Sequence, residues 1–365
     1  MANVAFAISS LSMGGIERVT TTIANGLASQ GHDVTLINLS NRKEYFPVLT
    51  QHHLKPGWLP YNWWRVKRKM SYLFHGDICK YTWEPWVRSQ FVGGRYDCII
   101  LNPDFFVYYD IVKKLHPESK IYLWMHNNYD VYIHKYFSEE VDILVKSVRE
   151  ADGIICLESD SAQSWGRLNE HVHVIHNPLT LAGSGTRSTL QSRTIACTSR
   201  LMKEQKGLDY LLAVASDLPE GWRVVLAGDG QDRKWLQSEI AARGLGAKLV
   251  LKGSLGDELL DKHYTEASIF LSTSRWEGFP LVAAEAMSRG LPFVAFDIPA
   301  MREVTSNGRY GLLAPLGDTV GMSRVLSGLM ESIGMRRHYA DLSLRRAKAF
   351  SLDKILRDWN EFVLQ

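Results

Sequence analysis

Short apolar segments typical of strands alternate along this chain with longer segments of helical periodicity, and this order limits the fold more than any other feature. The chain begins with an expected strand at 4–8, a helix at 16–30 and a strand at 34–39. Two strands joined through a helix lie parallel in one sheet. Further strands of this first block are expected at 98–101, 120–124, 153–157 and 172–175. We therefore predict an α/β fold with a doubly wound parallel sheet.

The same alternation starts again after residue 192. Its strands are expected at 194–198, 223–227, 249–251, 269–272 and 292–296, and its helices at 208–217, 233–244, 257–266 and 281–289. Between the blocks, residues 179–189 are rich in Gly, Ser and Thr, which is typical of a linker. A chain of 365 residues is also too long for one ordinary core. We predict two Rossmann-like domains, over 1–178 and 193–345, that face each other across a cleft and are joined by a linker over 179–192.

Composition and charge exclude several classes of protein. The chain has 42 basic and 39 acidic residues, and a net charge of +3 gives little attraction for nucleic acid. Its four cysteines are far apart in sequence, so neither a disulfide framework nor a zinc site is indicated, and we predict no metal. The first strand lacks the basic flank and cleavage site of a signal peptide, and no apolar run is long enough to span a bilayer. We expect a cytoplasmic protein.

Two glutamates eight positions apart follow the expected strand at 269–272. Glu277 falls in a loop that contains Gly278 and Pro280, and Glu285 falls in the helix that follows this loop. Loops at the carboxyl ends of parallel strands form the ligand sites of such sheets. Two acidic residues near a helix start can also serve only the helix dipole and solvation. The pair is therefore a candidate site whose interpretation depends on the neighbouring motifs.

A basic loop follows the first strand of the second block. Arg200, Lys203 and Lys206 come after the strand at 194–198, and Gly207 ends the segment. An arginine and a lysine at this edge can bind the phosphates of a nucleoside diphosphate and stabilise its negative charge as it departs. These cations could replace a divalent metal. The alternative is that the three side chains form an ordinary solvated face.

Two glycine-rich turns also follow strands. Gly14 and Gly15 precede the helix at 16–30, so the backbone can approach a ligand closely and the helix N-terminus can face an anion. Gly228 and Gly230 follow the strand at 223–227. Neither turn contains the Gly-x-Gly-x-x-Gly sequence of a dinucleotide site, so we do not favour NAD binding.

These motifs together resemble those of a known enzyme family. Residues 272–287, with their Glu-Gly-Phe-Pro and Glu-Ala-Met sequences, resemble the Glu-x7-Glu signature of the retaining, nucleotide-sugar-dependent glycosyltransferases of family GT4. Residues 199–207 resemble the Gly-Arg-Leu…Lys-Gly segment of that family, with Ser199 in place of the usual glycine. The resemblance covers almost the whole chain. It implies the GT-B fold, in which a last helix, here within 346–365, packs back on the first domain.

The resemblance also implies roles for single residues. Arg200 and Lys206 would contact the donor diphosphate, Glu277 the sugar hydroxyls and Glu285 the ribose. His126 matches a histidine that such enzymes place beside the transferred sugar, although a histidine after an apolar run can equally be a hydrogen-bonded core residue. The other expected donor-site residues are Gly14, Gly15, Gly228, Gly230, Gly278, Phe279, Pro280 and Leu281.

The reaction that the resemblance implies is transfer of a sugar from a nucleoside diphosphate with retention of anomeric configuration. Attack would come from the face that the diphosphate leaves, and no carboxylate can be assigned as a covalent nucleophile. No cofactor is expected, and UDP is the favoured carrier because it is common in the family. The sequence leaves open the donor sugar, the acceptor hydroxyl and the oligomeric state.

Aromatic and basic residues are interleaved between residues 54 and 91. The aromatic ones are Trp58, Tyr61, Trp63, Trp64, Tyr72, Trp83 and Trp86, and the basic ones are Arg65, Lys67, Arg68 and Lys69. This mixture suits contact with an anionic membrane, and aromatic rings also stack on sugars. The alternative is that the aromatic residues form core and the cations a solvated face. We favour a lipid-linked or lipopolysaccharide acceptor and a role in bacterial cell-surface polysaccharide synthesis, at the inner face of the membrane.

Two other functions fit the same motifs. A nucleotide-sugar epimerase can share the GT-B fold and the diphosphate site but needs no acceptor. A catalytically silent sugar-nucleotide-binding protein would bind the donor without turnover, although the intact glutamates and basic pair argue against it.

Overall fold

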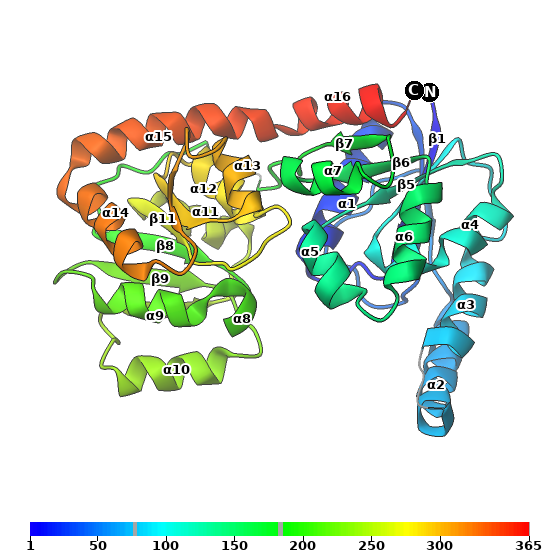
Figure 1. Cartoon of the computed structure of the whole chain (residues 1–365), viewed down its shortest axis with the longest axis horizontal. Helices are drawn as coiled ribbons and strands as arrows, with labels where there is room; N and C mark the ends of the chain where they lie inside the picture. The colour runs from blue at the N-terminus through cyan, green and yellow to red at the C-terminus, as the bar shows by residue number, and fades with distance from the viewer. Residues whose placement is uncertain (76–78, 182–184, 365) are drawn as a thin grey trace. The chain divides into compact units, whose positions relative to one another are not determined.

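The computed structural model describes residues 1–75, 79–181 and 185–364, with the backbone alone for residues 68, 71–75 and 79–82. The chain forms two compact units. Unit 1 comprises Met1–Pro178 and Leu352–Gln365, and unit 2 comprises Leu179–Ser351. Each unit is built on one parallel sheet (Figure 1).

The sheet of unit 1 has seven strands in the order β3-β2-β1-β4-β5-β6-β7, all parallel. The strands are β1 Asn3–Ile8, β2 Asp33–Asn38, β3 His52–Leu54, β4 Cys98–Leu101, β5 Lys120–Trp124, β6 Gly153–Cys156 and β7 Val172–Val174. The helices are α1 Gly15–Ser29, α2 Trp58–His75, α3 Cys79–Gln90, η1 Pro103–Tyr108, α4 Tyr109–Leu115, α5 Tyr129–Val131, η2 Tyr132–Tyr136, α6 Val141–Glu150, α7 Ser159–Trp165 and α16 Leu352–Phe362. The expected strands of the first block are therefore confirmed, whereas β3 and the helices between residues 54 and 165 were not predicted.

Both faces of the unit 1 sheet are covered, which explains why its strands are continuously apolar. Strand residues such as Ala5 and Leu101 share one buried cluster with Phe105 of η1. On the other face, Phe6 lies 5.6 Å from the ring of Trp359 in α16. The last helix therefore belongs to the core of unit 1.

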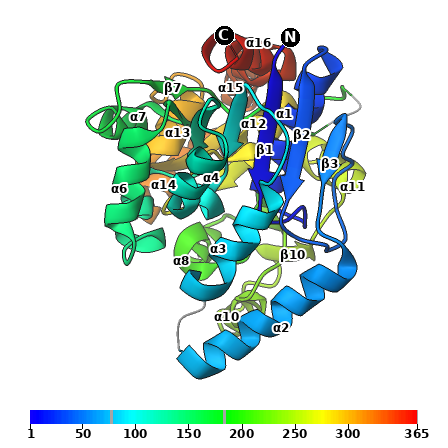
Figure 2. The same cartoon turned by 90° about the vertical axis from the view of Figure 1, so that its right-hand side faces the viewer.

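The aromatic stretch after β3 divides between core and surface. Tyr61, Trp64 and Trp86 are buried, and the rings of Trp64 and Trp86 stack with centroids 5.2 Å apart. Trp58 and Trp63 are exposed. Figure 2 shows α2 and α3 at the periphery of unit 1. The side chains of Tyr72 and Arg68 lie outside the described residues.

The sheet of unit 2 has six parallel strands in the order β10-β9-β8-β11-β12-β13. The strands are β8 Thr194–Thr198, β9 Arg223–Ala227, β10 Leu249–Gly253, β11 Ile269–Ser272, β12 Phe293–Asp297 and β13 Leu312–Pro315. The helices are α8 Lys203–Lys206, α9 Leu208–Ser216, α10 Arg233–Ala242, α11 Asp257–Thr265, α12 Leu281–Ser288, α13 Pro299–Thr305, α14 Thr319–Glu331, α15 Ile333–Ala347 and η3 Lys348–Phe350. Both units are thus doubly wound α/β sheets of the Rossmann type.

The segment expected as a linker contains no helix or strand in its described residues, 179–181 and 185–192. It is hydrogen-bonded to unit 2 near both of its ends. The Leu179 N–H donates to the Phe350 carbonyl at 2.7 Å, and the Ser188 N–H donates to the Arg289 carbonyl at 3.0 Å.

Candidate active site

Three loops that carry predicted site residues meet at the carboxyl edge of the unit 2 sheet. Strand β8 leads into the basic loop, β9 into the turn with Gly228, and β11 into the loop with Glu277. Because β8 pairs with both β9 and β11, the three loops are neighbours. Ligands of doubly wound sheets bind at this edge.

The centre of this edge is an ion pair between two predicted catalytic residues. The Lys206 Nζ lies 2.6 Å from Oε1 of Glu277, and the two side chains are only 15% and 11% exposed. The Ser274 hydroxyl donates to the same carboxylate oxygen at 2.6 Å. Lys206 is the last residue of α8, so the helix sets the position of Lys206. The Thr273 hydroxyl donates to the Lys206 carbonyl oxygen at 2.9 Å. A cation suited to phosphate and a carboxylate suited to hydroxyls are therefore held side by side.

Glycine allows the three loops to pack backbone against backbone. Gly207 has a φ of +59°, and a Cβ at this position would lie 2.1 Å from the Thr273 carbonyl oxygen. Gly228 has a φ of +136°, and its Cβ would lie 1.9 Å from the carbonyl oxygen of Ser199. Any side chain at either position would be strained and would push the loops apart.

Arg275 ties the basic loop to the glutamate loop. Its two terminal nitrogens donate to the two carboxylate oxygens of Asp209, at 2.9 and 2.6 Å, and its guanidinium lies 4.0 Å from the ring centroid of Tyr210. It also donates to the carbonyl oxygens of Lys203 and Glu204. Partial burial favours the neutral acid, but the hydrogen bonds from Arg275 hold the pKa of Asp209 below its usual value. The arginine thus fixes the loop from which Lys206 reaches Glu277.

Glu285 lies deeper than Glu277, in the first turns of α12. It is 2% exposed, accepts a hydrogen bond from the Tyr264 hydroxyl at 3.0 Å and one from the Thr180 hydroxyl at 3.4 Å. Helix α12 begins at Leu281, directly after Gly278, Phe279 and Pro280, and the ring of Phe279 packs edge-on against Phe350. Arg200, by contrast, is exposed, and its side chain makes no hydrogen bond with any of the described residues.

Gly230 lies in unit 2, in the turn after β9, whereas Gly14, Gly15 and His126 lie at the carboxyl edge of the unit 1 sheet. Gly14 precedes α1 in an extended conformation, and no side chain caps this helix. A Cβ at Gly14 would lie 2.1 Å from a carboxylate oxygen of Glu17, so the missing side chain leaves room for this glutamate. Gly15 is the first residue of the helix.

His126 follows β5 and is held in one tautomer. Its Nε2 lies 2.7 Å from Oδ1 of Asn102, whose Nδ2 donates to the Ala7 carbonyl at 2.8 Å. Because Oδ1 can only accept, Nε2 carries the proton and Nδ1 is an acceptor. Burial lowers the pKa of His126 to about 3, so the ring is neutral near pH 7. The backbone N–H of His126 donates to the Tyr132 hydroxyl at 2.8 Å.

Several residues of these contacts were not predicted as site residues. Ser274, Arg275 and Thr273 lie inside the motif that carries the glutamates, and their polar side chains next to a strand end were the available signal. Asn102 could have been found by the same rule, because it directly follows β4. Tyr264 gave no such signal, since it lies within a helix.

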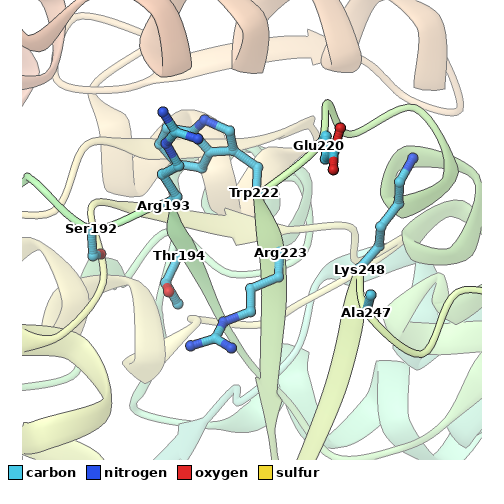
Figure 3. Close-up of a pocket in the computed structure, with 9 residues that line it drawn as sticks. Ser192, Arg193, Thr194, Glu220, Trp222, Arg223, Ala247 and Lys248 are labelled. Atoms are coloured by element: carbon cyan, nitrogen blue, oxygen red, sulfur yellow. The ribbon is translucent and has the colours of Figure 1, made fainter.

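A cavity of about 660 Å³ lies at the opposite edge of the unit 2 sheet, next to the amino ends of β8, β9 and β10 (Figure 3). Its cationic side chains do not converge. Arg223 and Lys248 extend in different directions, and the Lys248 Nζ donates to the Ser216 carbonyl at 2.7 Å. We therefore propose the carboxyl edge, and not this cavity, as the active site.

No group of three or more His, Cys, Asp or Glu side chains within 1–75, 79–181 and 185–364 could hold a metal ion. In the same ranges no helix has the length and apolar character needed to cross a bilayer.

Known proteins that this chain resembles in sequence include glycosyltransferases. A family model described as "Glycosyltransferase Family 4" matches residues 13–182, and one described as "Glycosyl transferases group 1" matches residues 192–332. An uncharacterized glycosyltransferase of Haemophilus influenzae is 25% identical over 355 residues, which are 95% of this chain and 96% of that protein.

A second relative, from Campylobacter jejuni, is named as an α-1,4-N-acetyl-D-galactosaminyltransferase that acts on an undecaprenol-diphosphate-linked saccharide. It is 21% identical over 373 residues, which are 100% of this chain and 99% of that protein. A crystal structure of Anabaena HepE in complex with UDP and glucose has a TM-score of 0.75 at 18% identity, and the match covers 99% of each chain.

The two parallel sheets and the solved structures that resemble them define the GT-B fold, and the two family models define the class as glycosyltransferases. Within that class, the chain belongs to family 4, the group 1 glycosyl transferases. The resemblance inferred from the sequence motifs is therefore confirmed.

Proposed function

We propose that this glycosyltransferase moves a sugar from a UDP-sugar to a saccharide acceptor, with retention of anomeric configuration and without a metal ion. The main support for the proposal is the ion pair of Lys206 and Glu277 at the carboxyl edge of the unit 2 sheet. The UDP complex of the similarly folded Anabaena protein supports UDP as the carrier.

The residues of unit 2 have complementary roles in this proposal. Lys206 and Arg200 stabilise the diphosphate as negative charge develops on it, and the N-terminus of α12 adds partial positive charge. Two cationic side chains at the leaving group are the reason for proposing a metal-independent reaction. Glu277 binds hydroxyls of the transferred sugar, and Glu285 binds the ribose.

Retention follows if the acceptor attacks from the face that the diphosphate leaves. The departing phosphate oxygen then accepts the acceptor's proton while the new glycosidic bond forms. Glu277 already binds the Lys206 ammonium and the Ser274 hydroxyl, which suits a role in positioning better than a role as covalent nucleophile. The neutral His126, with Nδ1 as an acceptor, can take a hydrogen bond from a donor-sugar hydroxyl in unit 1.

The acceptor is a lipid-linked saccharide at an anionic membrane surface, as in bacterial cell-surface polysaccharide or lipopolysaccharide synthesis. The name of the Campylobacter relative supports this class of acceptor. Helix α2 supports contact with a membrane, because Leu59, Trp63, Val66 and Met70 recur at helical spacing and are 47–72% exposed. An apolar helix face flanked by cations suits a lipid interface.

The flanking charge has one sign. Helix α2 contains Arg65, Lys67 and Lys69 but no acidic residue. Cations beside an apolar face are attracted by anionic headgroups, each by about 1 kcal/mol near the surface. The protein is therefore expected at the inner face of the cell membrane, as a peripheral protein.

The experiment that tests the proposal measures release of nucleoside diphosphate from a panel of sugar nucleotides, in EDTA and in magnesium, with and without a lipid extract of the source cell. We expect release from one UDP-sugar that rises with the extract and persists in EDTA. Nuclear magnetic resonance of the product should show the donor's anomeric configuration. Acceptor-independent conversion of the donor, or strict dependence on magnesium, would contradict the proposal.

A further inference from the structure

A pocket of about 460 Å³ opens at the carboxyl edge of the unit 1 sheet, and none of its residues was predicted as a catalytic or donor-binding residue. Trp83, in its wall, belongs to the aromatic stretch whose role the sequence left open. The wall of the pocket combines aromatic rings with hydrogen-bonding groups. The wall includes Ser9 after β1, Trp83 in α3, Asp104 in η1, Tyr136 at the end of η2, and Glu140 before α6. Ligand pockets typically have this mixture of apolar wall and a few polar groups.

The pocket is joined directly to the turn that carries His126. The Asn127 side chain donates to the Tyr136 hydroxyl at 3.3 Å. Asp104 follows Asn102 by two residues, and Asn102 accepts the hydrogen bond from His126. A ligand in the pocket would therefore lie next to the group that the proposed function assigns to the donor sugar.

The backbone here is also unusual. Residues Tyr132–Tyr136 form a π-helix, a rare conformation that occurs often at functional sites. The widened turn places Tyr136 in the wall of the pocket, where its side chain is 54% exposed, while Tyr132 at the other end is buried under the His126 turn.

We infer that this pocket binds one sugar ring of the acceptor and that the ring it accepts is uncharged. Sugar rings place C–H groups against aromatic faces, which Trp83 and Tyr136 supply, and their hydroxyls donate to carboxylates, which Asp104 and Glu140 supply. Neither carboxylate makes a side-chain hydrogen bond or ion pair with any residue in the described part of the chain. Two ionised carboxylates repel a phosphate or a uronic acid at the same position.

This inference rests on the proposed function and names the class of acceptor for it. The test uses the full-length protein and saturation-transfer difference NMR with two sets of probes. One set contains methyl glycosides of glucose, galactose, N-acetylglucosamine and N-acetylgalactosamine. The other contains glucose 6-phosphate and methyl glucuronide. We expect signals from at least one neutral glycoside and none from the anionic sugars.

Substitutions then locate the binding. Tyr136→Ala should weaken the binding of that neutral glycoside at least tenfold, because a stacking face is lost. Asp104→Asn should weaken it about tenfold, the equivalent of one hydrogen bond to a charged group, and should allow the anionic sugars to bind. Tyr45→Ala is the matched control, because Tyr45 is 56% exposed, lies in unit 1 and does not line the pocket.

UDP binding, measured by calorimetry on the same samples, separates this inference from the proposed function. If the unmodified protein does not bind UDP, the proposed function is wrong. If UDP binds but the glycoside signals persist unchanged in Tyr136→Ala, only the pocket assignment is wrong. The same holds if UDP binds and anionic and neutral sugars bind equally well. Absence of any glycoside signal at millimolar concentration, with UDP binding intact, would overturn the pocket assignment as well.

Discussion

The Lys206 ammonium lies 2.6 Å from the Glu277 carboxylate, within a site where both side chains are mostly covered. A diphosphate that binds Lys206 therefore competes with Glu277 for the same cation. A sugar that binds Glu277 removes part of this competition, because its hydroxyls give the carboxylate new hydrogen-bond donors. The pair thus couples recognition of the phosphate to recognition of the sugar.

This coupling predicts opposite effects on UDP binding for the two halves of the pair. Lys206→Ala should weaken UDP binding by about 10-fold to 100-fold, because a charge-assisted hydrogen bond is lost. Glu277→Gln should leave UDP binding equal or tighter, because the competing charge is gone, while turnover of the UDP-sugar falls by at least about 100-fold. Calorimetry with UDP and a diphosphate-release assay measure the two effects.

Lys262→Ala is the control, since Lys262 lies exposed on α11 and pairs only with Glu266 at the surface in the described structure. It should bind UDP as the unmodified protein does. Equal weakening of UDP binding by Lys206→Ala and Glu277→Gln would mean that the pair acts as a structural unit and not as two ligands with separate targets.

Arg275 should act as a positioning residue. Arg275→Ala removes the two bonds to Asp209 and those to the carbonyls of the basic loop, so Lys206 loses its fixed place. We expect kcat/KM to fall about 10-fold to 100-fold and the free energy of unfolding of unit 2 to fall by about 2 kcal/mol. Arg275→Lys should recover little, because lysine cannot donate two parallel bonds to one carboxylate.

The control for this position is Arg243→Ala, because Arg243 makes an exposed pair with Glu239 one turn away. Its kinetics should not change. If Arg275→Ala destabilises the protein but keeps kcat and KM, the contact is structural only, and the prediction is wrong.

The sequence predicted every strand except β3 and β13, which lie at the edges of their sheets, because continuously apolar segments between glycine, proline and polar residues leave few alternatives. It also placed Glu277, Lys206 and Gly228 at neighbouring strand ends, since the order of a parallel sheet brings those ends together. The predicted ends of the strands were less accurate. Strand β10 continues to Gly253, beyond the expected end, across an irregularity in its pairing with β9.

The contacts that support the site could not be predicted. Whether Trp64 or Trp63 is buried depends on the rotation of α2 about its axis, and a sequence dense in tryptophan on every side of a helix does not determine that rotation. The bond between Asn102 and His126 joins two strands 24 residues apart in sequence. Its geometry depends on the register of β4 against β5, which apolar periodicity alone does not specify.

The exposed face of α2 predicts binding to anionic vesicles. The protein should sediment with vesicles of phosphatidylglycerol and phosphatidylethanolamine at low salt and should be released as salt rises, because screening weakens the attraction of Arg65, Lys67 and Lys69. Replacing Leu59 and Trp63 by Ser should reduce binding at least tenfold. Both side chains are exposed, so stability should change little.

The matched control replaces Leu316 and Val320, two exposed apolar residues of unit 2, by Ser. This variant should bind vesicles normally. Binding that is indifferent to Leu59 and Trp63, or that is equally strong on vesicles of phosphatidylcholine alone, would show that α2 is not the lipid-binding face.

His126 gives a prediction about pH. Its ordinary pKa is 6.5, and burial lowers this to about 3 in the folded protein, so the unfolded chain takes up a proton between pH 6.5 and pH 3 that the folded chain does not. Stability from this residue is therefore complete above pH 6.5 and decreases as the pH falls, by about 1.4 kcal/mol per unit, or about 2 kcal/mol at pH 5. His126→Gln, which cannot take up this proton, should lose correspondingly less stability between pH 7.5 and pH 5.0 in thermal unfolding.

The direct measurement of this protonation is the ¹³Cε1 chemical shift of His126, assigned by the loss of its signal in His126→Gln. The shift should stay constant from pH 8 to pH 5. A midpoint between pH 6 and pH 7 would mean that the ring becomes charged in the folded protein, and Nδ1 could then no longer accept a hydrogen bond from a sugar hydroxyl at the lower pH.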